Sequence, residues 1–155
     1  MSPTITPHLW YTDDLFGALD FYTEVFGADA QVTTRIEISP QLSVAEFSLC
    51  GQQLRALQSA RDDFGFNDAF SLMIDCADQA EVDKYWDALL AGGSALQCGW
   101  LIDRFGLRWQ VIPRRLMELQ ADPNPARVTA VTTAMLTMVK LDVAALEAAA
   151  NSVTD

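Results

Sequence analysis

The sequence Leu9-Trp-Tyr-Thr-Asp-Asp-Leu-Phe-Gly-Ala-Leu-Asp-Phe-Tyr22 has a counterpart in Met73-Ile-Asp-Cys-Ala-Asp-Gln-Ala-Glu-Val-Asp-Lys-Tyr-Trp86, which begins 64 positions later. Each stretch predicts a short strand followed by an amphipathic helix, because apolar residues recur at helical spacing after the strand. Asp14 and Asp78 stand where a helix-capping side chain is expected. An aromatic pair follows each cap at the same distance. We interpret the match as an internal repeat.

The residues after each helix complete the repeat. Strands are predicted at 31–38 and 44–58, the latter interrupted at Gly51, and again from Leu96 to Ile102 and from Leu107 to Ile112. The sequence thus predicts an α+β fold that consists of two strand–helix–three-strand units, at about residues 4–60 and 66–113. The polar connector Arg61–Gly65 is the predicted boundary between them.

Residues 114–155 differ from both repeats and predict a helical C-terminal tail. Asp122-Pro-Asn-Pro125 is a helix start signal, and Asp142 precedes an Ala-rich helix through Ala150. The tail either packs on its own domain or on a partner subunit, and the sequence does not choose. We treat residues 1–155 as a single domain.

One such unit leaves a sheet face uncovered. Two units together are expected to curve their strands into an open mixed sheet, a trough with helices outside and ligand-contacting residues inside. Whether one chain or two complete the trough is left open.

The amino-acid composition limits the kinds of partner that this chain can bind. The 155 residues include 10 Lys plus Arg against 21 Asp plus Glu, a formal charge of −11, which disfavours nucleic acid and anionic membranes. No targeting or membrane-spanning pattern occurs, and the three cysteines have no metal-like spacing. We expect a cytoplasmic protein with reduced thiols, acting as a homodimer.

Several motifs resemble a known family: Ile5-Thr-Pro-His-Leu-Trp10, Val82-Asp-Lys-Tyr-Trp-Asp-Ala-Leu89 before Gly92-Gly93, Gln97-Cys-Gly-Trp-Leu-Ile-Asp-Arg-Phe-Gly106, and Trp109-Gln-Val-Ile-Pro113. They are similar to the PhnB-like family, labelled "3-demethylubiquinone-9 3-methyltransferase", of the vicinal oxygen chelate superfamily. That superfamily includes glyoxalase I, bleomycin-resistance proteins and ring-cleaving dioxygenases. The similarity runs from about Ile5 to Ala150 and implies a single glyoxalase-like domain.

The resemblance also implies where a metal would bind, at four positions on the first and last strands of the repeats. Carried over by the repeat, these are His8 and Leu72 on the first strands, with Arg55 and Gln110 on the last. Leucine cannot ligate, arginine is cationic and glutamine is a weak donor, so no catalytic metal and no other cofactor is expected. Methyltransferase activity is not expected either, because the loop Thr12–Leu15 lacks the glycines of a nucleotide-binding turn.

The remaining site candidates are individual side chains. His8 and Cys98 are candidate catalytic groups, as a general base and a nucleophile, although a backbone-bonded histidine and a small buried thiol are the plainer interpretations. Trp109 and Gln110 alternate, so only one of them faces the trough. Arg55 either orients a carboxylate or phenolate, or forms an internal ion pair with Glu46 or Asp103. The predicted ligand-binding residues are Trp10, Arg55, Trp100, Trp109 and Gln110.

Three functions remain open at this point. The leading hypothesis is a protein that binds a small, partly aromatic or apolar molecule without a catalytic metal, with no reaction assigned. The second is a metal-dependent lyase, isomerase or dioxygenase that uses His8. The third is a sequestering protein of the resistance type, whose affinity is its whole function.

Overall fold

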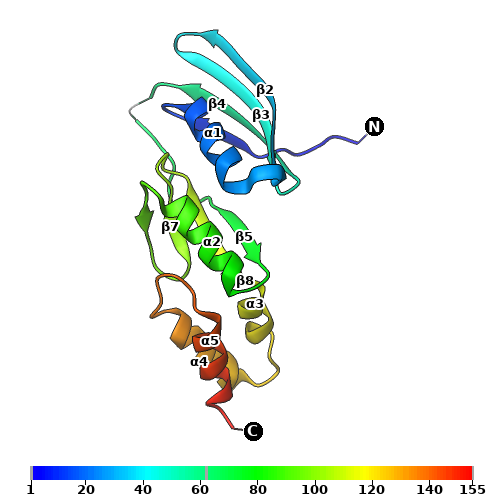
Figure 1. Cartoon of the computed structure of the whole chain (residues 1–155), viewed down its shortest axis with the longest axis vertical. Coiled ribbons are helices and arrows are strands. Elements are labelled where there is room, and N and C mark those ends of the chain that lie inside the picture. Colours follow the sequence, from blue (N-terminus) through cyan, green and yellow to red (C-terminus); the bar gives the residue numbers. More distant parts are fainter. Residues whose placement is uncertain (1, 62, 155) are drawn as a thin grey trace. The chain divides into compact units, whose positions relative to one another are not determined.

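The computed structural model describes residues 2–61 and 63–154, and Asp62 of the predicted connector lies outside the described residues. The chain divides into two compact units, Met1–Phe66 and Asn67–Asp155. Each unit contains one copy of the predicted repeat, and the second also carries the C-terminal tail (Figure 1).

The first unit is a strand–helix–three-strand module. In chain order its elements are β1 (His8–Tyr11), α1 (Leu15–Phe26), the short 3-10 helix η1 (Gly27–Asp29), β2 (Ala30–Ser39), β3 (Leu42–Leu49) and β4 (Gln52–Ser59). The sheet order is β1-β4-β3-β2, in which β1 runs parallel to β4 and the other pairs are antiparallel.

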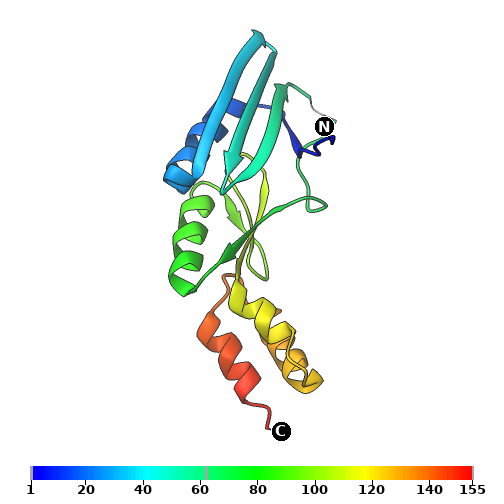
Figure 2. The same ribbon diagram turned by 90° about the vertical axis from the view of Figure 1, so that its right-hand side faces the viewer.

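Helix α1 covers one face of this sheet (Figure 2). The side chain of Asp14 caps it by accepting from the backbone N–H of Gly17 at 3.1 Å. The apolar face of α1 packs on the buried strand residues, and the hydroxyls of Tyr11 and Tyr22 share a buried hydrogen bond of 3.0 Å. Apolar burial against the sheet stabilises this helix, as expected for a face with helical spacing.

The second unit repeats the module. Its elements are β5 (Leu72–Cys76), α2 (Gln79–Leu90), β6 (Ser94–Ala95), β7 (Trp100–Ile102) and β8 (Arg108–Pro113). The sheet order β5-β8-β7-β6 matches the first sheet position by position, with β5 parallel to β8. The predicted α+β fold of tandem strand–helix–three-strand repeats is therefore confirmed.

The strand predicted from Leu96 to Ile102 forms only at its end, as β7 (Trp100–Ile102), and the short strand β6 (Ser94–Ala95) lies just before the predicted range. Cys98 and Gly99 between them both have positive φ, at 60° and 81°, which no extended strand allows. The predicted cap of α2 is present, because Asp78 accepts from the N–H of Glu81 and the Glu81 carboxylate accepts from the N–H of Ala77.

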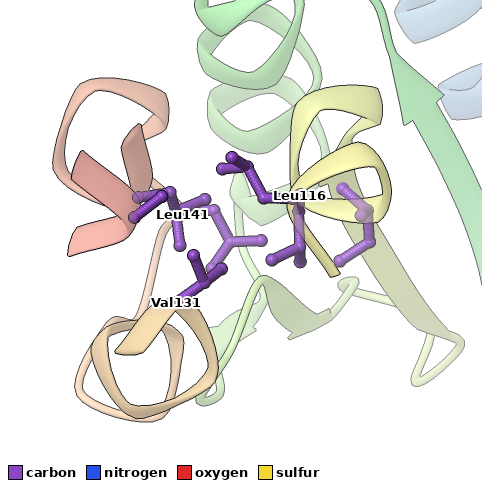
Figure 3. Close-up of a cluster of buried hydrophobic side chains, with 7 residues drawn as sticks. Leu116, Val131 and Leu141 are labelled. Carbon is purple, nitrogen blue, oxygen red and sulfur yellow. The ribbon is translucent and has the colours of Figure 1, made fainter. Parts of the chain in front are cut away.

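The tail forms three helices, α3 (Arg114–Gln120), α4 (Pro125–Met135) and α5 (Val143–Asn151). They surround an apolar cluster that also includes the end of β8, labelled in part in Figure 3. Its buried members are Ile112, Leu116, Leu119, Val131, Leu141, Leu146 and Ala150. The tail thus packs within its own unit, which the sequence left undecided.

The loop between α4 and α5 ties the tail to the second module. Met138 and Val139 accept from the backbone N–H groups of Cys98 and Gly99 at 2.8 and 2.7 Å. The side-chain amide of Gln79 on α2 donates to the carbonyl of Leu141 and accepts from the N–H of Val143. Within the described part of the chain, no helix has the length and hydropathy needed to span a bilayer.

Candidate functional site

The first sheet has one face covered by α1 and one without a helix, which we call the first helix-free face. Leu9 and Tyr11 of β1 are buried on the α1 side. Successive strand residues point to opposite faces, so His8 and Trp10 lie on the helix-free face together with Arg55, their neighbour on β4. Three sequence-predicted site residues therefore share one surface.

A polar row crosses this face in register. His8 pairs with Arg55, Arg55 with Glu46, and Glu46 with Thr34. The Arg55 guanidinium forms an ion pair with the Glu46 carboxylate at 2.8 Å, with the two side chains 60% and 45% exposed. An ion pair this exposed contributes at most about 1 kcal/mol to stability. Of the two partners proposed from the sequence for Arg55, Glu46 is the one found.

An apolar row runs beside the polar one. Trp10, Leu57, Val44 and Ile36 occupy matched positions on β1, β4, β3 and β2. The indole N–H of Trp10 donates to the carbonyl of Ser59 at 3.0 Å, which fixes the ring. One face of the sheet thus holds an aromatic and aliphatic strip next to a cationic group.

The residues after β4 add to the Trp10 end of this strip. Phe64 meets the Trp10 ring edge-on at 5.0 Å, and the guanidinium of Arg61 lies 5.9 Å from the Trp10 ring centre and 5.3 Å from that of Phe64. A bidentate pair with Asp63 holds Arg61 and raises its pKa. Sequence reasoning missed Arg61 and Phe64, because a polar connector gives no signal of which strand it folds back on.

The face of the second sheet opposite α2 corresponds to the first helix-free face, and we call its part around Met73, Gln110 and Trp100 the second helix-free face. Further along β8, Ile112 is on the same side and packs in the cluster of the tail helices. Met73, Gln110 and Trp100 are register partners across β5, β8 and β7. Met73 is 48% exposed, and the Gln110 amide donates to the Ser71 hydroxyl at 2.9 Å. This face also combines apolar and polar side chains, and it contains the predicted residues Trp100 and Gln110.

Trp109 lies on the other side of β8, buried among residues that pack with α2. Its side chain is 2% exposed, and its indole N–H donates to the Asp103 carboxylate at 2.8 Å. The alternation of Trp109 and Gln110 left two arrangements open, and the structure places Gln110 on the helix-free face. Trp109 belongs to the hydrophobic core of the second unit.

The register corrects one step in the predicted alignment of the repeats. His8 pairs with Arg55 on the first helix-free face, and the pair in the same place on the second face is Met73 with Gln110. Leu72, the predicted counterpart of His8, pairs instead with Trp109 on the α2 side. Two residues lie between Tyr11 and the cap of α1, whereas one lies between Cys76 and the cap of α2, so the alignment shifts by one position at this turn.

The cysteines lie in three different environments, and none of the three, all within the described residues, forms a disulfide. Cys98 is half-buried in the turn between β6 and β7, and its backbone N–H is bonded to the tail. Cys50 is exposed in the turn between β3 and β4. Cys76 is buried at the end of β5, and burial together with nearby carboxylates raises its pKa to about 12, so this thiol is a poor nucleophile near neutral pH.

The residues at the metal positions of the superfamily do not suit a divalent cation. The positions that the resemblance implies hold His8 and Arg55 in the first unit and, after the one-position shift, Met73 and Gln110 in the second. Taken unit by unit, a guanidinium, a thioether and an amide are not ligands that Mn²⁺ or Zn²⁺ prefers. Among the residues that the structure describes, no group of three His, Cys, Asp or Glu side chains is arranged to hold a metal ion.

Comparison with known families agrees with this architecture. The model of the 3-demethylubiquinone-9 3-methyltransferase family matches residues 3–112, which comprise both modules up to β8. The PhnB protein from Bacillus cereus is 26% identical with a TM-score of 0.64, over 72% of this chain and 99% of that chain. Curated protein sequences gave no match.

Two further solved structures share the fold at lower identity. The fosfomycin resistance protein FosX from Listeria monocytogenes, complexed with Mn(II) and sulfate, is 15% identical with a TM-score of 0.53, over 72% of this chain and 91% of that chain. The trypanothione-dependent glyoxalase I of Leishmania major is 14% identical with a TM-score of 0.54, over 78% and 93%. The chain belongs to the 3-demethylubiquinone-9 3-methyltransferase family, a PhnB-like family with the fold of the vicinal oxygen chelate superfamily.

Proposed function

We propose that this protein binds a small, partly aromatic molecule with an anionic group, such as an aromatic carboxylate or a phenolate, and that it does so without a catalytic metal. The observation that carries the proposal is the pairing of two rows on the first helix-free face. The polar row contains His8 and Arg55, and the apolar row beside it contains Trp10 and Leu57. The planar ring of such a ligand would contact the apolar row, and its acidic substituent would contact the polar row.

Arg55 is the group that would orient the anion. Its partner Glu46 is 45% exposed, so exchanging that carboxylate for one on a ligand costs little desolvation. A guanidinium presents two parallel N–H donors to a carboxylate, which fixes the direction of the ligand as well as its charge. His8 is next to Arg55 in register and would supply a second polar contact.

The apolar part of the ligand would contact the indole of Trp10. Its N–H is bonded to Ser59 and the ring also contacts Phe64 and Arg61, so a ligand would contact the part of this half-buried ring that stays exposed. In the second unit, Trp100 beside Gln110 presents a similar combination of an aromatic ring and an amide. We propose each face separately as a ligand-binding surface of its own unit and leave out the buried Trp109.

Titration with benzoate, 4-hydroxybenzoate, a benzoquinone and a glycopeptide tests binding, with tryptophan fluorescence and calorimetry as readouts. Arg55→Gln should weaken binding of the aromatic acids by about tenfold or more, the usual cost of losing a charge-assisted contact. Arg115→Gln is the matched control, because Arg115 is a comparably exposed, ion-paired arginine on α3. Equal weakening in both variants would contradict the assignment of Arg55.

The same titration separates the competing functions. A bound compound recovered unchanged supports binding or sequestration, whereas a new product in the mixture shows an enzyme. Metal analysis of the purified protein, with thermal shifts in Zn²⁺, Mn²⁺ and Ni²⁺, tests the metal-dependent alternative. A stoichiometric metal ion would overturn the metal-free proposal.

We further propose that the protein is a cytoplasmic homodimer. Its three cysteines form no disulfide among the described residues, which is consistent with a reducing compartment, and large apolar side chains such as Ile36 and Ile38 are exposed. Light scattering at several protein concentrations tests the dimer, and a monomer at every concentration would refute it.

A further inference from the structure

The two sheets carry different side chains at equivalent positions of their helix-free faces. In the first unit, the row across β1, β4 and β3 consists of His8, Arg55 and Glu46. In the second unit, the same places on β5, β8 and β7 are occupied by Met73, Gln110 and Trp100. A row with an imidazole, a guanidinium and a carboxylate thus corresponds to a row with a thioether, an amide and an indole, none of which is charged at neutral pH.

The amide of Gln110 is at the centre of this second row. It donates to the Ser71 hydroxyl at 2.9 Å, which uses one of its two amide hydrogens. Among the residues that the structure describes, the carbonyl oxygen of this amide has no hydrogen-bond partner, and neither has the indole N–H of Trp100. Gln110 therefore presents one N–H donor and one C=O acceptor on a side chain that Ser71 orients.

The neighbours of Gln110 in the row add apolar surface. Trp100 is half-buried beside it on β7, and Met73 on β5 is 48% exposed. An indole packs well against another planar ring, and a thioether also makes favourable contacts with aromatic rings. A flat ring with a polar edge would therefore find partners for both of its parts in this row.

The charge of Arg108, which lies two residues before Gln110 on the same side of β8, is compensated within the unit. Its guanidinium donates to the Asp68 carboxylate at 2.7 Å and to the carbonyl of Gly106 at 2.8 Å, and its side chain is 18% exposed. The side chain of Arg55 on the first face is 60% exposed. An anionic ligand therefore has a more accessible guanidinium on the first face than on the second.

We propose that the second helix-free face binds a neutral planar group with an adjacent donor and acceptor, namely a carboxamide on an aromatic ring or a cyclic lactam. This inference rests on the proposed use of the helix-free faces for ligands, and it assigns the second face a ligand class different from the anion of the first. A carboxamide offers the N–H and C=O groups that complement those of Gln110. A carboxylate has only acceptors, so it would place its negative charge against the carbonyl oxygen of Gln110.

Benzamide and benzoate separate the two faces, because they share a ring and have nearly the same size. In ¹H–¹⁵N NMR spectra of the wild-type protein, benzamide should shift the indole N–H signal of Trp100 and leave that of Trp10 in place. Benzoate should shift the Trp10 signal and leave that of Trp100. The lactam 2-pyridone should behave like benzamide, and this measurement needs no variant beyond those that assign the two signals.

Substitutions test the same assignment by calorimetric titration. Gln110→Met keeps the length of the side chain but removes its donor and acceptor, so it should weaken benzamide binding about tenfold and leave benzoate binding unchanged. Arg55→Gln should have the opposite effect. Gln41→Met, at an exposed position in the turn between β2 and β3, is the matched control and should change neither affinity.

The possible results distinguish this inference from the proposed function. Benzamide that leaves the Trp100 signal in place while benzoate binds, or benzamide affinity that is unchanged in Gln110→Met, would overturn the inference and leave the anion site of the first face intact. Benzamide bound at Trp100 with no aromatic acid bound would overturn the anion site and leave this inference standing. Failure of both compounds to bind would overturn both.

Discussion

The carboxylate of Asp103 accepts a hydrogen bond from the indole N–H of Trp109 at 2.8 Å, and both side chains are buried. The other carboxylate oxygen of Asp103 accepts from the backbone N–H groups of Phe105 and Leu107 at 2.8 and 3.1 Å. One side chain thereby fixes the turn between β7 and β8 and the position of a core tryptophan. Because Gln110 follows Trp109, this contact also sets which face of β8 the glutamine occupies.

Replacing Asp103 should therefore destabilise the second unit strongly. Asp103→Ala is expected to lower the free energy of unfolding by about 2–4 kcal/mol, since it removes the acceptor of two buried N–H donors and of one partly buried N–H donor. Urea denaturation followed by far-UV circular dichroism measures the change. Asp75→Ala, at an exposed position on β5, is the control and should change stability by less than about 0.5 kcal/mol.

A double-mutant cycle separates the indole contact from the turn. Trp109→Phe keeps one aromatic ring but removes the five-membered ring with its N–H, and combining it with Asp103→Asn gives the coupling between the two side chains. We expect a coupling energy of about 1–2 kcal/mol. Strictly additive effects of the two substitutions would show that the hydrogen bond contributes nothing to stability.

Gln79 should be the main polar connection between the tail and α2. Its side chain bonds both the carbonyl of Leu141 and the N–H of Val143, so Gln79→Ala leaves two partly buried backbone groups unsatisfied. We expect a loss of about 1–2 kcal/mol and faster amide exchange at Val143, measured by NMR. Lys140→Gln breaks the exposed ion pair with Asp83 and should have a smaller effect on the same amide. Unchanged exchange in Gln79→Ala would contradict this role.

The turn between β3 and β4 offers a stabilising substitution. Cys50 and Gly51 are its two central residues, and both have positive φ, at 47° and 83°. Such turns favour Asn followed by Gly, because asparagine tolerates left-handed backbone better than cysteine does. Cys50→Asn should raise stability by about 0.5–1 kcal/mol in denaturant melts, whereas Cys50→Val, with a branched β-carbon, should lower it. A stability gain in the valine variant would show that the turn relaxes to another conformation.

The architecture could be predicted from the sequence because each element carries a local signal. Asp14 and Asp78 mark the helix starts, the helical apolar spacing marks the buried faces, and both modules repeat these features in the same order. The break at Cys98 had no such signal, because a non-glycine residue with positive φ is not expected from residue type.

Side-chain orientation was harder to predict than element order. Side chains alternate between the two faces of a strand. The turn before α1 is one residue longer than the turn before α2, so the predicted alignment matched His8 with Leu72, which lies on the α2 side, and not with Met73. Likewise, alternation alone could not show which of Trp109 and Gln110 lies on the α2 side of β8, because this depends on the contact of Trp109 with Asp103. The pairing of Arg55 with Glu46 was among the sequence-based alternatives, since both were placed on neighbouring strands.

The thiol of Cys76 should make stability depend on alkaline pH. Its pKa in the folded protein is raised to about 12 from an ordinary value of 9.0, because burial disfavours the thiolate and the carboxylates of Glu81, Asp75 and Asp78 repel it. Above pH 9 the unfolded chain therefore loses a proton that the folded chain keeps. Stability from this group is complete below pH 9 and declines as the pH rises toward 12, by up to about 1.4 kcal/mol per pH unit.

The difference in free energy of unfolding between wild type and Cys76→Ala, measured at pH 8 and at pH 10.5, isolates this effect from other titrating groups. That difference should shrink at the higher pH. Parallel pH profiles for wild type and Cys76→Ala would mean that Cys76 ionises as readily in the folded chain as in the unfolded one.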